Sequence, residues 1–240
     1  KTTTGYPDNP PKSRIARLRP QALCGILTSM KIKLSYFPVP FWRAEISRVA
    51  LFMADIDFEN DYVSFDTFRE LKQSGTLPFG QLPILEVDGE VIAQTGAIAR
   101  FCGKLSGLYP RDNDLEAAQI DQFIDAATDV TWLFRPTMGI KDKEEKLAMR
   151  AEIGEKKLPK WLGRLERLLD KDESPYAVGG KMTLADLTLW RLTAWLNGGI
   201  LDGLPTTCVE PYTKMQAHFE MMESQPKIRA WMDGRYPVKM

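Results

Sequence analysis

Histidine and cysteine are scarce in this sequence, with one histidine and three cysteines among 240 residues. A single histidine, His218, excludes a histidine-rich metal site and argues against Ser-His-Asp chemistry, so we expect a packing or surface histidine. Cys24, Cys102 and Cys208 are odd in number and contain no CxxC spacing, which is not the pattern of a disulfide framework. The composition therefore points to a reducing compartment and to a site without a metal.

Net charge and long apolar runs are missing as well. The 32 basic residues balance 32 acidic residues, so the formal net charge is zero. Nucleic-acid binding draws most of its affinity from a basic surface, and this balance argues against it. No apolar run approaches the roughly 20 residues that a membrane-spanning helix needs. The chain is 44% hydrophobic, which is enough to build one large domain core or two small ones. A net charge of zero does not argue against binding of a small ligand.

Residues 1–29 differ from the rest of the chain. They are rich in basic residues and proline and contain a single acidic residue, Asp8, whereas a strongly patterned segment opens at Met30. We therefore expect an N-terminal extension, which would be a targeting remnant, a disordered tail or an arm that docks on a larger complex. A targeting remnant would place the protein in a plastid or mitochondrion; otherwise we expect the cytoplasm.

Alternation and turn signals predict a mixed domain over residues 30–107. Ile32–Tyr36 alternates apolar and polar residues and stops before two prolines, as a short strand does. Asp88-Gly89 is the two-residue turn signal of a hairpin between Pro83–Val87 and Glu90–Ala93. The other expected elements are a helix over 42–53, a strand over 58–63, a weak helix over 66–73 and a helix over 98–105. The order βαβαββα predicts a thioredoxin-like domain.

The pattern changes near Gly107–Asn113, where we expect a linker. Beyond it, apolar residues recur at helical spacing and little strand pattern is left. We therefore expect an all-helical domain over residues 114–240. Within it, Thr183–Asp186 is a capping box, which signals the start of a helix.

Three motifs resemble the sigma class of glutathione transferases, the class that includes prostaglandin D synthases. They are Leu34–Phe37 followed by Arg43–Glu45, then Thr76–Gly89, then Gln94–Arg100. The resemblance covers residues 31 to about 235. It implies a thioredoxin-like domain followed by a helical domain, glutathione as co-substrate, a role in detoxification and a homodimer.

The resemblance assigns the catalytic role to Tyr36, with Arg43 as its helper. A thiol such as that of glutathione has a pKa of about 8.5 and is mostly protonated at neutral pH, whereas the thiolate is the nucleophile. Lowering this pKa by about two units needs roughly 2.7 kcal/mol of preferential thiolate stabilisation. A tyrosine hydroxyl pointed at the sulfur and a nearby cation can supply much of it.

The resemblance also assigns two pairs of residues to glutathione binding. Leu82-Pro83 matches a cis peptide whose leucine backbone pairs with the cysteinyl part of glutathione. Gln94-Thr95 matches the pair that holds the γ-glutamyl carboxylate. A helix N-terminus suits a carboxylate, and Thr95 is the expected N-cap of the helix that follows.

Further ligand contacts follow from the same resemblance. Phe68 and Lys72 correspond to a tryptophan and a lysine that reach the glycyl end of glutathione, although Lys72 equally fits a solvated helix lysine. Gln81 stands where a lysine is common. Acidic residues recur every four positions over Asp121–Asp129. They form either a solvated face or, as the family implies, a contact from Asp129 across the dimer to the ligand's amino group.

The sequence departs from the family between Tyr36 and Arg43. The family's Arg-Gly-Arg-Ala-Glu is replaced by Pro40–Glu45, one residue later, so one arginine and one glycine are absent. Phe68 and Gln81 also replace a tryptophan and a lysine of the family. Each charged contact is worth about 1.5–3 kcal/mol when desolvated, and we therefore expect weaker glutathione binding.

The second-substrate pocket is expected between Pro38–Phe41 and the helix carrying Asp129–Phe134. Phe41, Trp132 and Phe134 would make it apolar, unless they are core residues. We therefore expect a transferase that conjugates glutathione to a small apolar electrophile. Two alternatives stay open: an isomerase that returns glutathione unchanged, and a non-catalytic subunit of a larger complex.

Overall fold

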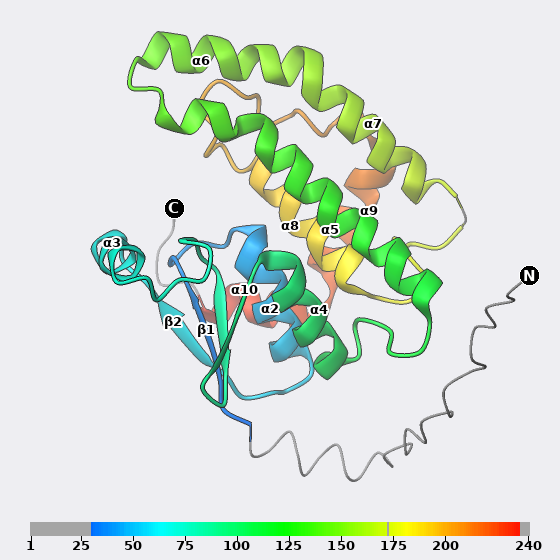
Figure 1. Cartoon of the computed structure of the whole chain (residues 1–240). Coiled ribbons are helices and arrows are strands. Elements are labelled where there is room, and N and C mark those ends of the chain that lie inside the picture. Colours follow the sequence, from blue (N-terminus) through cyan, green and yellow to red (C-terminus); the bar gives the residue numbers. More distant parts are fainter. Residues whose placement is uncertain (1–29, 172, 236–240) are drawn as a thin grey trace, which may run out of the picture. The chain divides into compact units, whose positions relative to one another are not determined.

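The computed structural model describes residues 30–171 and 173–235 (Figure 1). The extension predicted over residues 1–29, and the choice among its roles, lie outside the described residues. Within the described ranges, no helix is both long and apolar enough to cross a membrane.

A four-stranded mixed sheet forms the centre of the first domain. Its strands, β1 (Ile32–Tyr36), β2 (Glu59–Tyr62), β3 (Ile84–Val87) and β4 (Glu90–Ala93), follow the order β2-β1-β3-β4. β1 pairs parallel with β2 and antiparallel with β3, which pairs antiparallel with β4. Both residues of the Asp88-Gly89 turn have a positive φ, as a tight hairpin requires. The predicted hairpin is therefore confirmed.

Three helices complete this domain: α2 (Trp42–Met53), α3 (Phe65–Gln73) and α4 (Thr95–Ser106). α2 and α4 pack against each other on one side of the sheet, whereas α3 lies beside β2 (Figure 1) and has no buried residue. The predicted order βαβαββα and the thioredoxin-like fold are confirmed. Nine of the twelve residues of α2 are buried, because this helix also packs against the second domain through α8.

The second domain is helical, as predicted. Its elements are α5 (Asp114–Phe134), a 3-10 turn η1 (Arg135–Gly139), α6 (Lys143–Glu152), a π turn η2 (Ile153–Lys157), α7 (Leu158–Leu169), α8 (Leu184–Asn197), α9 (Thr213–Ser224) and α10 (Pro226–Arg235). α8 packs against α5 and α9 as well as α2, so twelve of its fourteen residues are buried. The predicted capping box opens α8: Thr183 N–H donates to Asp186 Oδ2 at 2.7 Å.

The two domains meet at the loop that joins β1 to α2. Trp42 Nε1, in the first turn of α2, donates to Thr131 Oγ1 of α5 at 2.9 Å. One turn further along α2, Trp231 Nε1 of α10 donates to the buried carboxylate of Glu45. The loop with Tyr36 at its start and Arg43 just beyond its end therefore lies at the junction between the domains.

Candidate active site

Tyr36 ends β1 and has a buried ring with an uncommitted hydroxyl. Its ring meets Phe37 edge-on at 5.3 Å and lies 5.8 Å from the guanidinium carbon of Arg48. No group in the part of the chain that the structure describes bonds to the hydroxyl. Burial raises the pKa of Tyr36 to about 12, with Arg43 and Arg48 acting in the opposite direction. The hydroxyl is therefore a protonated hydrogen-bond donor at neutral pH.

Arg43 is a half-buried cation at the start of α2. Its guanidinium carbon lies 5.0 Å from the Trp42 ring centroid, and it forms no ion pair with any carboxylate among the described residues. Burial lowers the pKa of Arg43, Tyr36 raises it and Arg135 lowers it further. An arginine in such a setting remains charged. Arg43 can therefore offer its charge to a bound anion.

A small cavity gathers Arg43 with most of the residues assigned to glutathione. Its lining is Arg43, Phe79, Gln81, Leu82, Pro83, Ala93, Gln94 and Thr95. The Leu82-Pro83 peptide is cis, as the resemblance implied. Leu82 and Pro83 line the cavity and directly precede β3, so the Leu82 backbone lies just beyond the paired part of that strand. Three motifs far apart in sequence thus meet at one place.

The structure corrects the expected N-cap of α4. The first helical hydrogen bond runs from Ile98 N–H to Gln94 O at 3.0 Å, so Gln94 is the N-cap and Thr95 is already the first helical residue. Gln94 has a φ of 75°, and its side chain makes no capping bond. The first N–H groups of α4 are therefore not satisfied by a side-chain cap and can receive a carboxylate.

Phe68 and Lys72 of α3 lie next to this region. Phe68 meets Phe37 edge-on at 5.3 Å. Lys72 lies along the turn before Gln81, because a Cβ placed on Gly80 would be 3.7 Å from Lys72 Cε. Lys72 can therefore reach the end of the cavity nearest Gln81.

Asp129 is exposed on α5 and does not line the cavity. Its two acidic neighbours are engaged, since Arg100 Nε lies 2.7 Å from Asp121 and Nη2 lies 3.9 Å from Asp125. Asp129 has no ion pair within the described residues. It is therefore the member of this acidic series that stays available to a ligand.

The three aromatic residues assigned to the second substrate lie in different settings. Phe41 and Phe134 both contact Trp195 edge-on, at 5.2 and 5.6 Å between ring centroids. Phe134 is fully buried, whereas Trp132 is 53% exposed. Phe134 therefore packs against Trp195 in the protein interior and does not face solvent.

Two residues of α8 beside the loop were not found from the sequence. Trp195 contacts Phe41, and Arg191 Nη2 donates to Pro40 O at 2.6 Å. α8 is buried on almost all sides, so no apolar periodicity distinguishes the face toward the loop. The partners are also separated by 151 positions in sequence.

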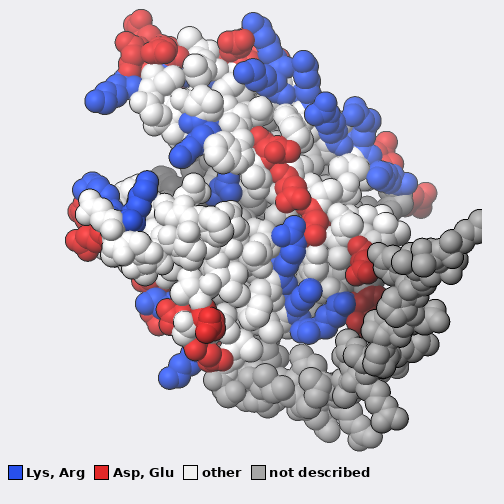
Figure 2. Space-filling view, viewed as in Figure 1, with Lys and Arg blue, Asp and Glu red and all other residues white. Residues whose placement is uncertain are grey.

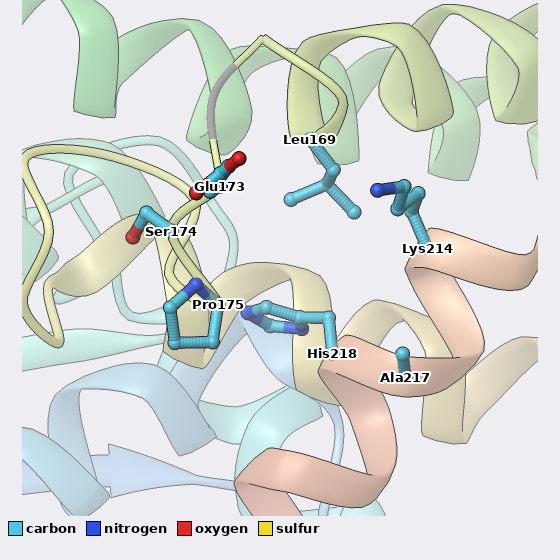
Figure 3. Close-up of a pocket in the computed structure, with 7 residues that line it drawn as sticks. All are labelled: Leu169, Glu173, Ser174, Pro175, Lys214, Ala217 and His218. Carbon is cyan, nitrogen blue, oxygen red and sulfur yellow. The ribbon is translucent and has the colours of Figure 1, made fainter.

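A more open cavity lies elsewhere, against α7, α9 and the segment between α7 and α8. Figure 3 shows its lining: Leu169, Glu173, Ser174, Pro175, Lys214, Ala217 and His218. His218 is buried, and its Nε2 lies 3.0 Å from Asp186 Oδ1. The histidine therefore helps to hold the start of α8, as a packing residue. None of these residues belongs to the cavity that contains Arg43.

Comparison with known proteins matches both domains. The family model for the glutathione S-transferase N-terminal domain matches residues 32–103, and that for the C-terminal domain matches residues 130–235. Glutathione S-transferase 1 of Ascaris suum is 31% identical over 208 residues, which span 85% of this chain and 96% of the relative. Probable glutathione S-transferase 7 of Caenorhabditis elegans is 33% identical over 210 residues, with the same coverage of both chains.

Solved structures give the same result. Prostaglandin synthase D of Nilaparvata lugens has a TM-score of 0.76 and 26% identity, over 87% of this chain and 100% of its own. Monomeric Na-GST-3, a glutathione S-transferase of Necator americanus, has a TM-score of 0.71 and 30% identity, over 88% of this chain and 100% of its own.

Proposed function

Because this chain belongs to the glutathione S-transferase family, we propose that it conjugates the glutathione thiolate to apolar electrophiles, with Tyr36 and Arg43 activating the sulfur. The observation that carries the proposal is the cavity in which Arg43 joins Leu82, Gln94 and Thr95. The Arg43 cation would face the sulfur, and the Leu82 backbone would pair with the cysteinyl part of glutathione. The N-terminus of α4, at Gln94 and Thr95, would receive the γ-glutamyl carboxylate.

The chemistry follows from the charges around the sulfur. The protonated Tyr36 hydroxyl donates a hydrogen bond to the thiolate, and the Arg43 guanidinium stabilises its charge, so the thiol proton is released to solvent at neutral pH. The thiolate then attacks an electrophilic carbon. A carbon–sulfur bond forms, and the leaving group departs with its electron pair.

One experiment tests this function directly. The protein is passed over immobilised glutathione and then assayed for conjugation of a generic aryl halide. Retention and turnover are the expected results. A protein that is neither retained nor active would instead favour the non-catalytic subunit.

The second substrate is proposed to bind beside Phe41 and Trp132, between the β1–α2 loop and the end of α5. Phe134 would support this pocket from behind through Trp195, since it is fully buried. The scarcity of cysteine and the family together favour the cytoplasm as the compartment.

Introducing a lysine in place of Gln81 is expected to tighten glutathione binding. Gln81 is exposed at the cavity edge, near Lys72, and a second cation there would meet the glycyl carboxylate. Because the position is solvated, the gain should be about 2- to 5-fold, as for an exposed ion pair. Isothermal titration with glutathione measures it. Gln73→Lys is the control. Gln73 follows Lys72 at the end of α3 and is not part of the cavity lining, so this variant should leave the affinity unchanged.

We further propose that the protein is a homodimer in which Asp129 of one copy reaches the glutathione amino group in the other. Figure 2 shows the acidic residues of α5 as a row on one exposed face. Asp129→Asn should weaken glutathione binding roughly 5- to 20-fold, because a charge-assisted hydrogen bond is lost. Asp125→Asn is the matched control. A monomeric sedimentation coefficient, with full glutathione affinity in Asp129→Asn, would contradict the proposal.

Glutathione-dependent isomerisation is the second candidate. It is favoured by the structural likeness to prostaglandin synthase D of Nilaparvata lugens. The same activated thiolate would attack the substrate and then be expelled, so that glutathione is not consumed. Recovery of free thiol after turnover separates this outcome from conjugation.

A further inference from the structure

The loop between Tyr36 and Arg43 is anchored by two arginines from different domains. Two of its residues are prolines, which cannot donate a backbone hydrogen bond. Its carbonyl groups accept instead: Arg48 of α2 donates to Phe37 O at 3.4 Å and to Val39 O at 3.3 Å. Arg191 of α8 donates to Pro40 O at 2.6 Å, the shortest of the three bonds.

The two arginines differ in how their charge is compensated. Arg48 also donates to Asn60 at 2.9 Å and lies 3.5 Å from the Glu45 carboxylate. Arg191 is 5% exposed and forms no ion pair with a carboxylate of the described residues. Its Nε is buried, and no group in residues 30–171 or 173–235 bonds to it. The Trp190 ring, 4.8 Å from the Arg191 guanidinium carbon, compensates part of the charge. A buried charge without a carboxylate partner still costs folding free energy, so stability alone does not explain Arg191.

Apart from the Trp190 ring, Arg191 contacts the loop, through its hydrogen bond to Pro40. Trp195 follows it by four positions on α8 and therefore lies on the same helix face. The Trp195 ring meets Phe41 at 5.2 Å, while Arg191 holds the preceding carbonyl of Pro40. Two neighbouring side chains of α8 thus fix two consecutive residues of the loop.

We propose that Arg191 is a positioning residue for the transfer reaction, acting through the Pro40 carbonyl. This inference rests on the proposed function. Pro40 and Phe41 directly precede α2, whose first turn carries Arg43. Fixing the Pro40 carbonyl therefore sets where Arg43 stands relative to the sulfur and where the Phe41 ring faces the second substrate. The helical domain thus takes part in thiol activation through this bond, beside the Phe41–Trp195 contact and the Trp42–Thr131 hydrogen bond.

The test compares Arg191→Met with Thr193→Val on the same helix. Thr193 is buried as well, and its Oγ1 has no partner among the described residues, so the valine variant is a matched control. Arg191→Met should keep or raise the midpoint of urea denaturation, because it removes a poorly compensated charge. Its kcat/KM for the electrophile should fall about 10- to 100-fold, as expected when a catalytic group is displaced by about 1 Å.

Two further readouts separate positioning from a general structural role. The acid limb of the pH profile of kcat/KM should move to higher pH in Arg191→Met, because Arg43 no longer stands at the sulfur. The affinity for glutathione should fall by less than kcat/KM does, since Leu82, Gln94 and Thr95 stay in place while Arg43, which shares their cavity, is displaced. Thr193→Val should match the wild type in all of these measurements.

Amide hydrogen exchange makes the test independent of activity. Residues 37–45 should exchange faster in Arg191→Met than in the wild type or in Thr193→Val. If wild-type chain did not conjugate glutathione, the proposed function would fail, whereas the exchange rates would still decide whether Arg191 holds the loop. Wild-type kinetics together with wild-type exchange in Arg191→Met would overturn the inference.

A variant that fails to fold does not end the test. Arg191→Lys keeps the charge but loses the planar guanidinium. The inference then requires slower transfer at an unchanged denaturation midpoint, and a wild-type rate in Arg191→Lys would refute it.

Discussion

Replacing Tyr36 with phenylalanine is expected to lower the rate of glutathione conjugation about 30- to 100-fold near neutral pH. The variant loses one hydrogen-bond donor to the sulfur, so the thiol pKa should return toward about 8.5 and most of the thiolate should be lost. The fold should be unaffected, because no described group bonds to the Tyr36 hydroxyl while the ring keeps its contact with Phe37. Conjugation of an aryl halide, with thermal denaturation alongside, measures both effects.

The pH dependence gives this prediction a second test. Since burial raises the pKa of Tyr36 to about 12, the hydroxyl stays protonated at all lower pH values and is lost as a donor only as the pH rises through that value. The wild-type rate should therefore rise with pH at the lowered thiol pKa and show no decline from tyrosine ionisation below about pH 11. In Tyr36→Phe the rising limb should move to higher pH. Coincident limbs in the two proteins would remove Tyr36 from the mechanism.

Local signals in the sequence were enough to predict the first strand and the hairpin of the first domain. The alternation in Ile32–Tyr36 and the Asp88-Gly89 turn each depend on a few neighbouring residues, and both elements are present. The cis Leu82-Pro83 peptide was available only through the resemblance, because most X-Pro bonds are trans.

The N-cap of α4 shows where local reasoning fails. Thr95 has the side chain of an N-cap, and residue type favours it there. The chain instead turns into the helix at Gln94, in a left-handed conformation uncommon for glutamine. A backbone turn imposed by the tertiary fold therefore outweighed the preference of the side chain, at a position that we assign to the ligand.

The sequence analysis also failed to predict contacts between segments that are distant in the sequence. Pro40 and Phe41 gave no sign that their partners would be Arg191 and Trp195. Phe134 likewise carries nothing in its own surroundings to show that it packs behind Trp195 instead of facing a substrate. Such pairings are set by how α8 packs across both domains, and a single sequence does not encode that packing in any local pattern.

The largest loss of stability is expected from replacing Asp186 with alanine. The buried carboxylate accepts bonds from Ala177 N and Thr183 N, both at 2.7 Å, and from Thr183 Oγ1 at 3.0 Å. It also faces His218 Nε2 at 3.0 Å. Removing it leaves the buried Thr183 N–H, the partly buried Ala177 N–H and an imidazole without this partner, at the start of the helix on which both domains pack. The free energy of unfolding should fall by about 3–5 kcal/mol.

Urea denaturation measures this loss against a matched aspartate on a helix surface. Asp125 has a side chain that is 72% exposed and lies 3.9 Å from Arg100, so Asp125→Ala should change stability by less than about 0.5 kcal/mol. Because α8 also carries Arg191 and packs against α2, Asp186→Ala should lose activity in parallel with the folded fraction. If Asp186→Ala stayed as stable as Asp125→Ala, the capping box would not be what holds α8, and with it the β1–α2 loop, in place.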